Sequence, residues 1–311
     1  MPMEIILRIR AFCAALAAIP PLSLAQQAAA HGFAGDRFFP ATIATDDPFV
    51  ADEMSLPTVT VNPRASDGSK ETDIGFDIAK RVTRSFGLTL DDQWKYVRVP
   101  GSPAMKGWDA LSTGAQYQLF VNAPHELIAL VGVDVSWAHT GRVNGAGAPD
   151  FTTVTPSFDF GKGFGDLPDS LPWLRPFAIT GNLGVDFPTK ITSAGQANAN
   201  ANIFNYGIAL EYSLEYLQHH VRDIGLAAPF DRMIPLVELS MATPFNRGQG
   251  SQTTGTVQPG LIWAGQHFQI GAEAIIPVNS LSGHGFGGIV QFHLFLDDLF
   301  PNSIGKPLFG D

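Results

Sequence analysis

The chain has 311 residues and a formal net charge of −10, with 15% charged and 45% hydrophobic residues. This composition is too apolar for a disordered chain, and the acidic balance argues against nucleic acid as a partner. The 32 glycines and the 11% of aromatic residues favour strands and turns, because both residue types are poor helix formers.

The N-terminal thirty residues (1–30) have the pattern of a secretory signal peptide. Arg8 and Arg10 begin a short apolar run, and small residues then offer cleavage sites after Ala25 or after Ala30. The alternative is a buried N-terminal helix. No segment of the sequence reaches the roughly 18–20 uninterrupted apolar residues of a membrane-spanning helix. We therefore expect an exported protein, and its only cysteine lies in the segment that export removes.

Residues 31–55 show no strand pattern, and they carry a cluster of acids at Asp46, Asp47, Asp52 and Glu53. Two interpretations are open for this segment. It could be an irregular periplasmic leader, which we favour, or a plug that folds into a pore.

From Thr72 onward the sequence alternates with a period of two, the repeat of a β-strand. The clearest stretch is Phe204–Tyr216, in which one face is apolar and aromatic and the other is small or polar. This stretch is longer than the five or six residues usual in soluble proteins, and a tilted membrane-spanning strand needs about nine to eleven. The stretch is therefore typical of a transmembrane strand.

Eleven strands follow from the alternation, and a twelfth from the even strand number of bacterial barrels. Two connections, 162–174 and 218–232, are long for the periplasmic side, and each could carry a short helix. The barrel should cover residues 56–296, with a C-terminal tail at 297–311. The expected strands lie near 56–61, 72–83, 86–98, 109–121, 127–139, 151–161, 175–188, 203–217, 233–244, 255–263, 267–278 and 285–296.

Two physical arguments favour closure of these strands into a barrel. Long exposed strand edges invite aggregation, and closure removes the edges. The large residues share one face while Gly, Ala, Ser and Asn share the other, which is the arrangement of a membrane barrel. The predicted fold is thus all-β, a transmembrane antiparallel up-and-down β-barrel of about twelve strands.

Four short segments of the C-terminal third are followed by a glycine-rich last strand: Pro235–Leu239, Val257–Leu261, Phe268–Ala272 and Ile276–Val278. In this order they resemble the outer-membrane proteins grouped as the MetA-pathway of phenol degradation family. The resemblance covers about residues 70–296 and implies an outer-membrane barrel for uptake or transport of small, often aromatic, compounds, with no catalytic residues. The tail after Phe295 departs from barrels that end on an aromatic residue.

Charged residues on the small, polar face are candidates for the lining of a pore. An acid-lined pore would favour cations or polar neutral solutes, because rings of charge set selectivity. Equally, the same groups could form acid–base networks that fill a narrow barrel. The candidates are Asp73, Asp77, Arg81, Lys95, Asp134, Asp186, Glu211, Glu215, Glu238 and Glu273.

These patterns predict a channel or transporter for small molecules, aromatic or hydrophobic compounds among them, in a bacterial outer membrane. Its partners would be outer-membrane lipids and solutes, with no cofactor, no metal and no catalytic residue. One alternative is a plugged barrel with a structural or adhesive role. A lipid hydrolase is the weaker alternative, because Ser136 and His139 face opposite sides of their strand and no Gly-x-Ser-x-Gly motif occurs.

Overall fold

The computed structural model describes residues 32–143, 146–147, 149–193, 199–248, 250 and 252–310. The expected signal peptide lies outside the described residues.

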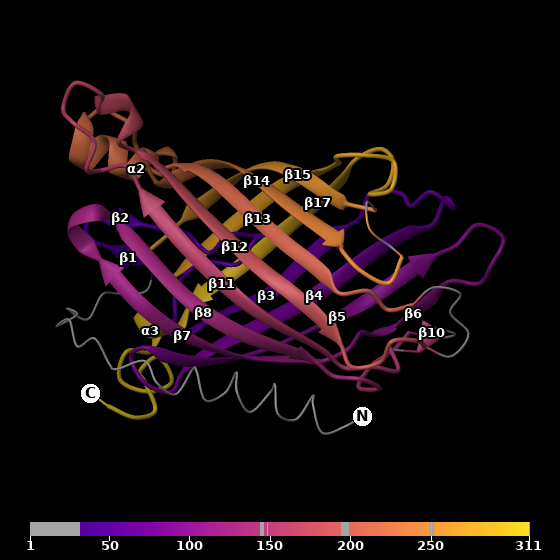
Figure 1. The fold of residues 1–311 in the computed structure, drawn as a ribbon. Coiled ribbons are helices and arrows are strands. Elements are labelled where there is room, and N and C mark those ends of the chain that lie inside the picture. Colours follow the sequence, from indigo (N-terminus) through magenta and orange to yellow (C-terminus); the bar gives the residue numbers. More distant parts are fainter. Residues whose placement is uncertain are drawn as a thin grey trace.

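The fold is a closed barrel of twelve antiparallel strands, as the alternation and the even strand number together predict (Figure 1). Each strand pairs with its neighbours along the chain, and the last strand pairs with the first, which closes the ring. None of the described helices is long and apolar enough to cross a membrane. The barrel strands are β3 (Glu53–Val61), β4 (Lys70–Arg81), β5 (Phe86–Arg98), β7 (Ser112–Asn122), β8 (Leu127–Ser136), β11 (Thr153–Gly163), β12 (Phe177–Pro188), β13 (Ile203–Tyr212), β14 (Met233–Pro244), β15 (Thr254–Ala264), β16 (Phe268–Pro277) and β17 (Gly287–Phe295).

Both ends of the barrel sequence, the start of β3 and the end of β17, lie at one rim, which we call the terminal end. The two long connections at this rim carry short helical turns, in agreement with the expectation for the segments 162–174 and 218–232; the short β7–β8 connection also carries one, η1 (Ala123–His125). Figure 1 shows the terminal end at the left, with α2 above it. The helical elements of the two long connections are η2 (Pro172–Leu174), α2 (Leu214–Tyr216), η3 (Leu217–Val221) and η4 (Phe230–Arg232).

The strand predicted over 203–217 is shorter than expected, because β13 ends at Tyr212. The hydroxyl of Ser213 accepts a hydrogen bond from the backbone N–H of Tyr216 and caps α2. Glu215 therefore lies in the first turn of a helix, and strand alternation does not place it on the lumen wall.

At the opposite end the wall is extended by three short strands, β6 (Met105–Trp108), β9 (Arg142–Val143) and β10 (Ala146–Gly147). The terminal half of β5 pairs with β7, and the other half pairs with β6. The strand predicted from residue 109 consequently begins only at Ser112.

The two faces of the wall differ as the sequence pattern requires. On β16, Gln269 and Glu273 point inward and are buried, whereas Ile270 between them is 45% exposed on the outer face. Large apolar residues on the outer face suit contact with lipid, and small or polar ones suit the lumen.

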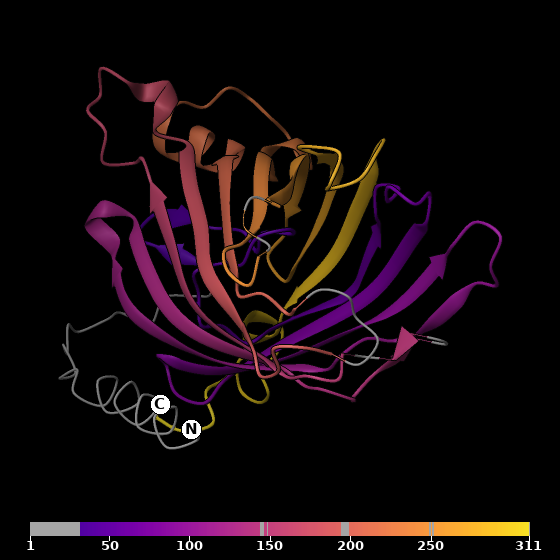
Figure 2. The same ribbon diagram turned by 45° about the vertical axis from the view of Figure 1, so that its right-hand side comes forward.

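Residues 32–52, which we call the inner segment, lie within the ring of strands (Figure 2). They begin with the hairpin of β1 (Phe33–Ala34) and β2 (Arg37–Phe38). Phe39 and Phe49 of this segment pack against Ile128 of β8 in one buried apolar cluster. A second cluster joins Phe38 and Ile43 to inward residues of β14 and β15. The apolar core thus lies between the inner segment and the wall, in the terminal half of the barrel.

The tail after β17 folds back on the terminal end. A short helix, α3 (Leu296–Leu299), follows the last strand directly. Further on, the backbone N–H of Leu308 and of Phe309 bond to the carbonyls of Arg81 and Val82 at 3.2 and 2.8 Å. The tail therefore covers the rim where β4 ends.

Truncation of Phe39 should loosen the inner segment, because its side chain is 1% exposed and Phe→Ala in a packed core costs about 3–5 kcal/mol. We expect F39A to retain the barrel, seen as heat-modifiable gel mobility, while protease cuts the inner segment faster. The matched control is F158A, whose side chain is 38% exposed on the outer face of β11. Equal cleavage of both variants would contradict the packing role of Phe39.

Candidate functional site

The lumen is the candidate site, and its main structural feature is the set of hydrogen bonds between the wall and the inner segment. Glu238 on β14 is fully buried, and its carboxylate accepts four hydrogen bonds from one turn of that segment. The donors are the backbone N–H groups of Ile43 (2.8 Å), Ala44 (3.1 Å) and Thr45 (2.7 Å), and the hydroxyl of Thr45 (2.7 Å). Successive N–H groups that converge in this way form an anion-binding nest, so a carboxylate suits the turn better than a neutral side chain.

Two glutamines of the wall hold the rest of the inner segment. The side-chain amide of Gln118 donates to the carbonyl of Pro48 (3.1 Å) and accepts from the N–H of Val50 (3.2 Å). Gln269 donates to the carbonyl of Ala41 at 2.5 Å. The irregular backbone of the inner segment thus bonds to side chains of the wall, whereas a strand would bond to its neighbouring strands.

At the terminal end a buried arginine fixes the hairpin. Arg37 on β2 is 1% exposed; its guanidinium bonds to Glu126 (3.2 Å) and to the carbonyl of Pro176 (2.9 Å). The same group lies 3.7 Å from the ring centre of Tyr216, a cation–π contact. Tyr216 in turn donates its hydroxyl to Glu126 at 2.8 Å. Three separate connections of the terminal end therefore meet at the hairpin.

The inner segment leaves the lumen at Asp52, which is fully buried. Its carboxylate accepts from the ammonium of Lys80 (2.6 Å) and from the guanidinium of Arg81 (2.7 Å) on β4. Its backbone carbonyl accepts from the N–H groups of Leu296 and Asp297, at 2.9 and 3.2 Å. Asp52 thus joins the inner segment, the first two strands and the tail at the place where β3 pairs with β17.

The residues predicted to line a pore have different partners in the structure. Arg81 pairs with Asp52, Lys95 pairs with Asp109 (2.8 Å) and Glu71 (3.2 Å), and Glu238 holds the inner segment. Glu215 lies off the wall, in α2.

The remaining predicted residues are acids on inward positions, and neighbouring polar side chains meet several of them. Asn62 donates to Asp73 (2.7 Å), Thr155 to Asp186 (2.7 Å) and Thr180 to Glu211 (3.1 Å). Asp77 and Asp134 lie on inward positions of β4 and β8, and Glu273 lies beside Glu238.

The structure adds lumen acids that are not among the predicted pore-lining residues, including Asp46, Asp91 and Asp159. Asp159 alternates with outward Phe158 and Phe160 on β11, so the Phe-Asp-Phe pattern could have revealed it. Asp91 follows Leu90 in the same way on β5. No sequence pattern could reveal Asp46, because it lies on the irregular inner segment.

The opposite half of the lumen is more open. A cavity of about 480 Å³ lies there, next to the wall of β12–β15. Its inward lining is uncharged and mostly polar, with Asn182, Asn205, Ser240 and Thr256 beside Ala242. The side-chain amide of Asn182 donates to Asp46 at 3.1 Å. The tip of the inner segment is thus at the floor of this cavity.

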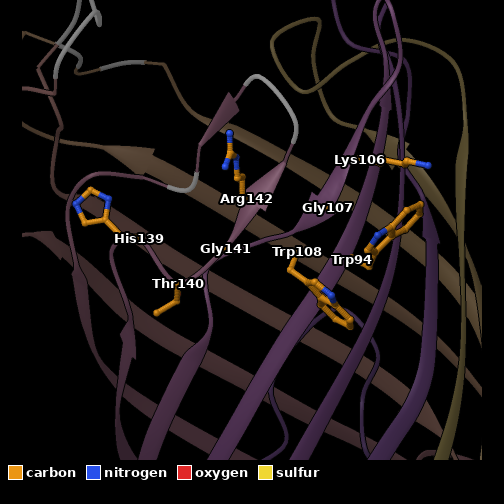
Figure 3. Close-up of a pocket in the computed structure, with 8 residues that line it drawn as sticks. All are labelled: Trp94, Lys106, Gly107, Trp108, His139, Thr140, Gly141 and Arg142. Atoms are coloured by element: carbon orange, nitrogen blue, oxygen red, sulfur yellow. The ribbon is translucent and has the colours of Figure 1, made fainter.

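A second hollow, of about 640 Å³, lies at the rim of the opposite end (Figure 3). Trp94, Trp108 and Arg142 occupy laterally paired positions on β5, β6 and β9, on the face opposite to inward Lys95. Indoles with an arginine at a strand end fit the interface between lipid tails and headgroups. This hollow is therefore separate from the lumen.

In comparisons with known proteins, no protein-family model matches the chain, and no curated protein matches its sequence. The COG4313 outer membrane channel from Pseudomonas putida F1 has a similar fold, with a TM-score of 0.51 and 11% identity over 82% of this chain and 99% of the channel. Similar structures at lower scores include the KdgM porin (TM-score 0.45, 10% identity, 78% and 98% coverage) and the NanC porin (0.46, 8%, 77% and 98%). At 11% identity the similarity to the COG4313 channel shows the fold alone, that of an outer-membrane type of barrel.

Alkaline pH should weaken the contacts among Arg37, Glu126 and Tyr216 at the terminal end. Burial and the hydrogen bond to Glu126 raise the pKa of Tyr216 to about 12, above the value of about 10 for a free tyrosine. A raised pKa in the folded state contributes stability that is complete below pH 10 and is lost as the pH rises towards 12. We expect absorbance titration of the phenols to show one late tyrosine that Y216F removes. An unchanged titration in Y216F would contradict this assignment.

Proposed function

We propose that this protein is an outer-membrane channel for small solutes, and that the inner segment narrows its lumen. The observation that carries the proposal is a closed barrel whose terminal half is packed with residues 32–52 while the opposite half holds an open polar cavity. A barrel closed only for stability would need no such division of its interior. A passage for solutes requires an open vestibule and a constriction that selects.

The charges inside the lumen favour cations. The inward basic side chains Arg37, Arg81 and Lys95 are engaged with acids: Arg37 with Glu126, Arg81 with Asp52, and Lys95 with Asp109. Acids such as Asp91, Asp134 and Asp159 form no ion pair with any Lys or Arg of the described ranges. The lumen therefore carries a net negative field, which concentrates cations and repels anions.

The chemical nature of the natural solute is a further part of the proposal. The resemblance of the C-terminal third to the MetA-pathway of phenol degradation family would add small aromatic compounds to the solutes that pass the channel. The polar, uncharged lining of the cavity around Asn205 and Ser240 supports solutes that form hydrogen bonds.

Ion selectivity tests the electrostatic part of the proposal. In planar bilayers with a tenfold KCl gradient, the reversal potential of the wild-type channel should have the sign of K⁺ preference, because Asp91, Asp134 and Asp159 have no Lys or Arg partner among the described residues. Anion preference would contradict the charge argument, and failure to conduct at any voltage would contradict the channel itself.

Conductance of an E238Q variant tests the constriction. A neutral amide cannot replace a carboxylate that accepts four hydrogen bonds, and bonds to a charged group contribute about 1.5–3 kcal/mol each. Loss of one such bond should raise the fraction of time the inner segment is undocked roughly 10- to 100-fold. Single-channel records should then show frequent larger openings.

The matched control is E215Q, the same substitution in α2, outside the wall. Its conductance should equal that of the wild type. If E238Q shows the same unitary conductance and open probability as E215Q, the inner segment does not limit the passage.

A further inference from the structure

Four carboxylates surround the place where the open cavity meets the tip of the inner segment. Asp46 at the tip is exposed to the lumen, and it lies close enough to each of the other three to repel it electrostatically. Three of the four come from the wall, on β5, β8 and β11. We call this group the lumen carboxylates: Asp46, Asp91, Asp134 and Asp159.

A nearly buried carboxylate oxygen in this group lacks a partner. Asp159 is 2% exposed, and its Oδ1 has no hydrogen-bond donor among the described residues, while its Oδ2 has only the hydroxyl of Ser157 at 3.3 Å. A buried carboxyl oxygen without a hydrogen-bond partner is costly, so native proteins seldom keep one without a reason. Its acidic neighbours are Asp46 on the inner segment and Asp134 on the adjacent strand β8, and neither can donate when ionised. The arrangement therefore calls for a donor that carries positive charge.

The wall is shaped to give these carboxylates room. A Cβ atom on Gly114 would lie 2.1 Å from the Oδ1 of Asp134 and 2.2 Å from the Oγ1 of Thr89. Any other residue at position 114 would thus displace the Asp134 carboxylate. Asn182 connects the group to the open cavity, since it lines that cavity and donates to Asp46.

The spacing of the wall carboxylates excludes a compact metal chelate. The strand register places Asp91 two strands and two residues from Asp134, about 12 Å between backbones. Asp134 and Asp159 are one strand and four residues apart, about 14 Å. No group of three His, Cys, Asp or Glu residues in the described ranges could hold a metal ion. A ligand for these acids must therefore carry several positive charges spread along its length.

We propose that the lumen carboxylates form a binding site for a linear aliphatic polyamine. Each ammonium group of such a molecule supplies three donors and a full charge, and the methylene chain spaces the charges. Asp46 would bind it from the inner segment, and the acids of the wall from the other side. The site rests on the proposed function, because it lies on the path a solute would take from the cavity to the constriction.

Calorimetric titration of the full-length protein in detergent with spermidine tests the site. We expect saturable binding to the wild type, at least tenfold weaker in D91N and in D134N. The matched control is D92N, the next residue along β5, which lies on the outer face and should bind as the wild type does. D46N should weaken binding as much as D134N does. Because this substitution leaves the wall intact, it still tests the site if a wall variant fails to fold.

Three results would overturn the site: no binding to the wild type, equal weakening in D92N, or displacement of spermidine by Mg²⁺ at the concentration expected from ionic screening alone. Conductance in KCl without polyamine is measured on the same preparations. A protein that conducts but does not bind spermidine keeps the proposed channel and loses the site. A protein that binds but never conducts keeps the site and loses the channel.

Discussion

The carboxylate of Glu238 and the turn it binds are the interaction on which the lumen depends. A chain that runs irregularly through a barrel cannot satisfy its own backbone N–H groups, and buried groups left unpaired would be costly. Glu238 provides acceptors for three consecutive amides and one hydroxyl at a single point of β14. The path of the inner segment is fixed from there, toward Gln269 on one side and toward Gln118 on the other.

The division of the interior follows from this anchor. The apolar residues of the inner segment fill the terminal half, where β8, β14 and β15 present Ile and Leu inward instead of small polar residues. The opposite half receives no such filling, and its wall stays polar. A single chain thus makes both a packed core and an accessible chamber, and Asp46 lies at the boundary between them.

Closure of the ring concentrates a second set of charges at the terminal rim. Asp52 binds β4 with its side chain and the start of the tail with its backbone carbonyl, so the ends of the barrel sequence are joined by one buried residue. The Arg37–Glu126–Tyr216 group does the same for the hairpin and the connecting turns. Both groups are satisfied ion pairs, whereas the lumen carboxylates are not. This contrast separates the structural charges from those available to a solute.

The amino-acid sequence by itself determined the barrel, because a period of two over nine to thirteen residues leaves each strand one lipid face and one lumen face. It also placed Asp134, Asp186, Glu211, Glu238 and Glu273 on inward positions of the strands. The same rule failed at Glu215, where Ser213 starts a helix although the alternation continues. Only the tertiary structure decided what occupies the lumen. Residues 32–52 have no periodicity, and their position follows from hydrogen bonds to Glu238, Gln118 and Gln269, whose partners lie 68 or more residues away in the sequence. Local patterns cannot encode such distant partners, so the division into a packed half and an acidic chamber emerges only when the ring closes around the inner segment.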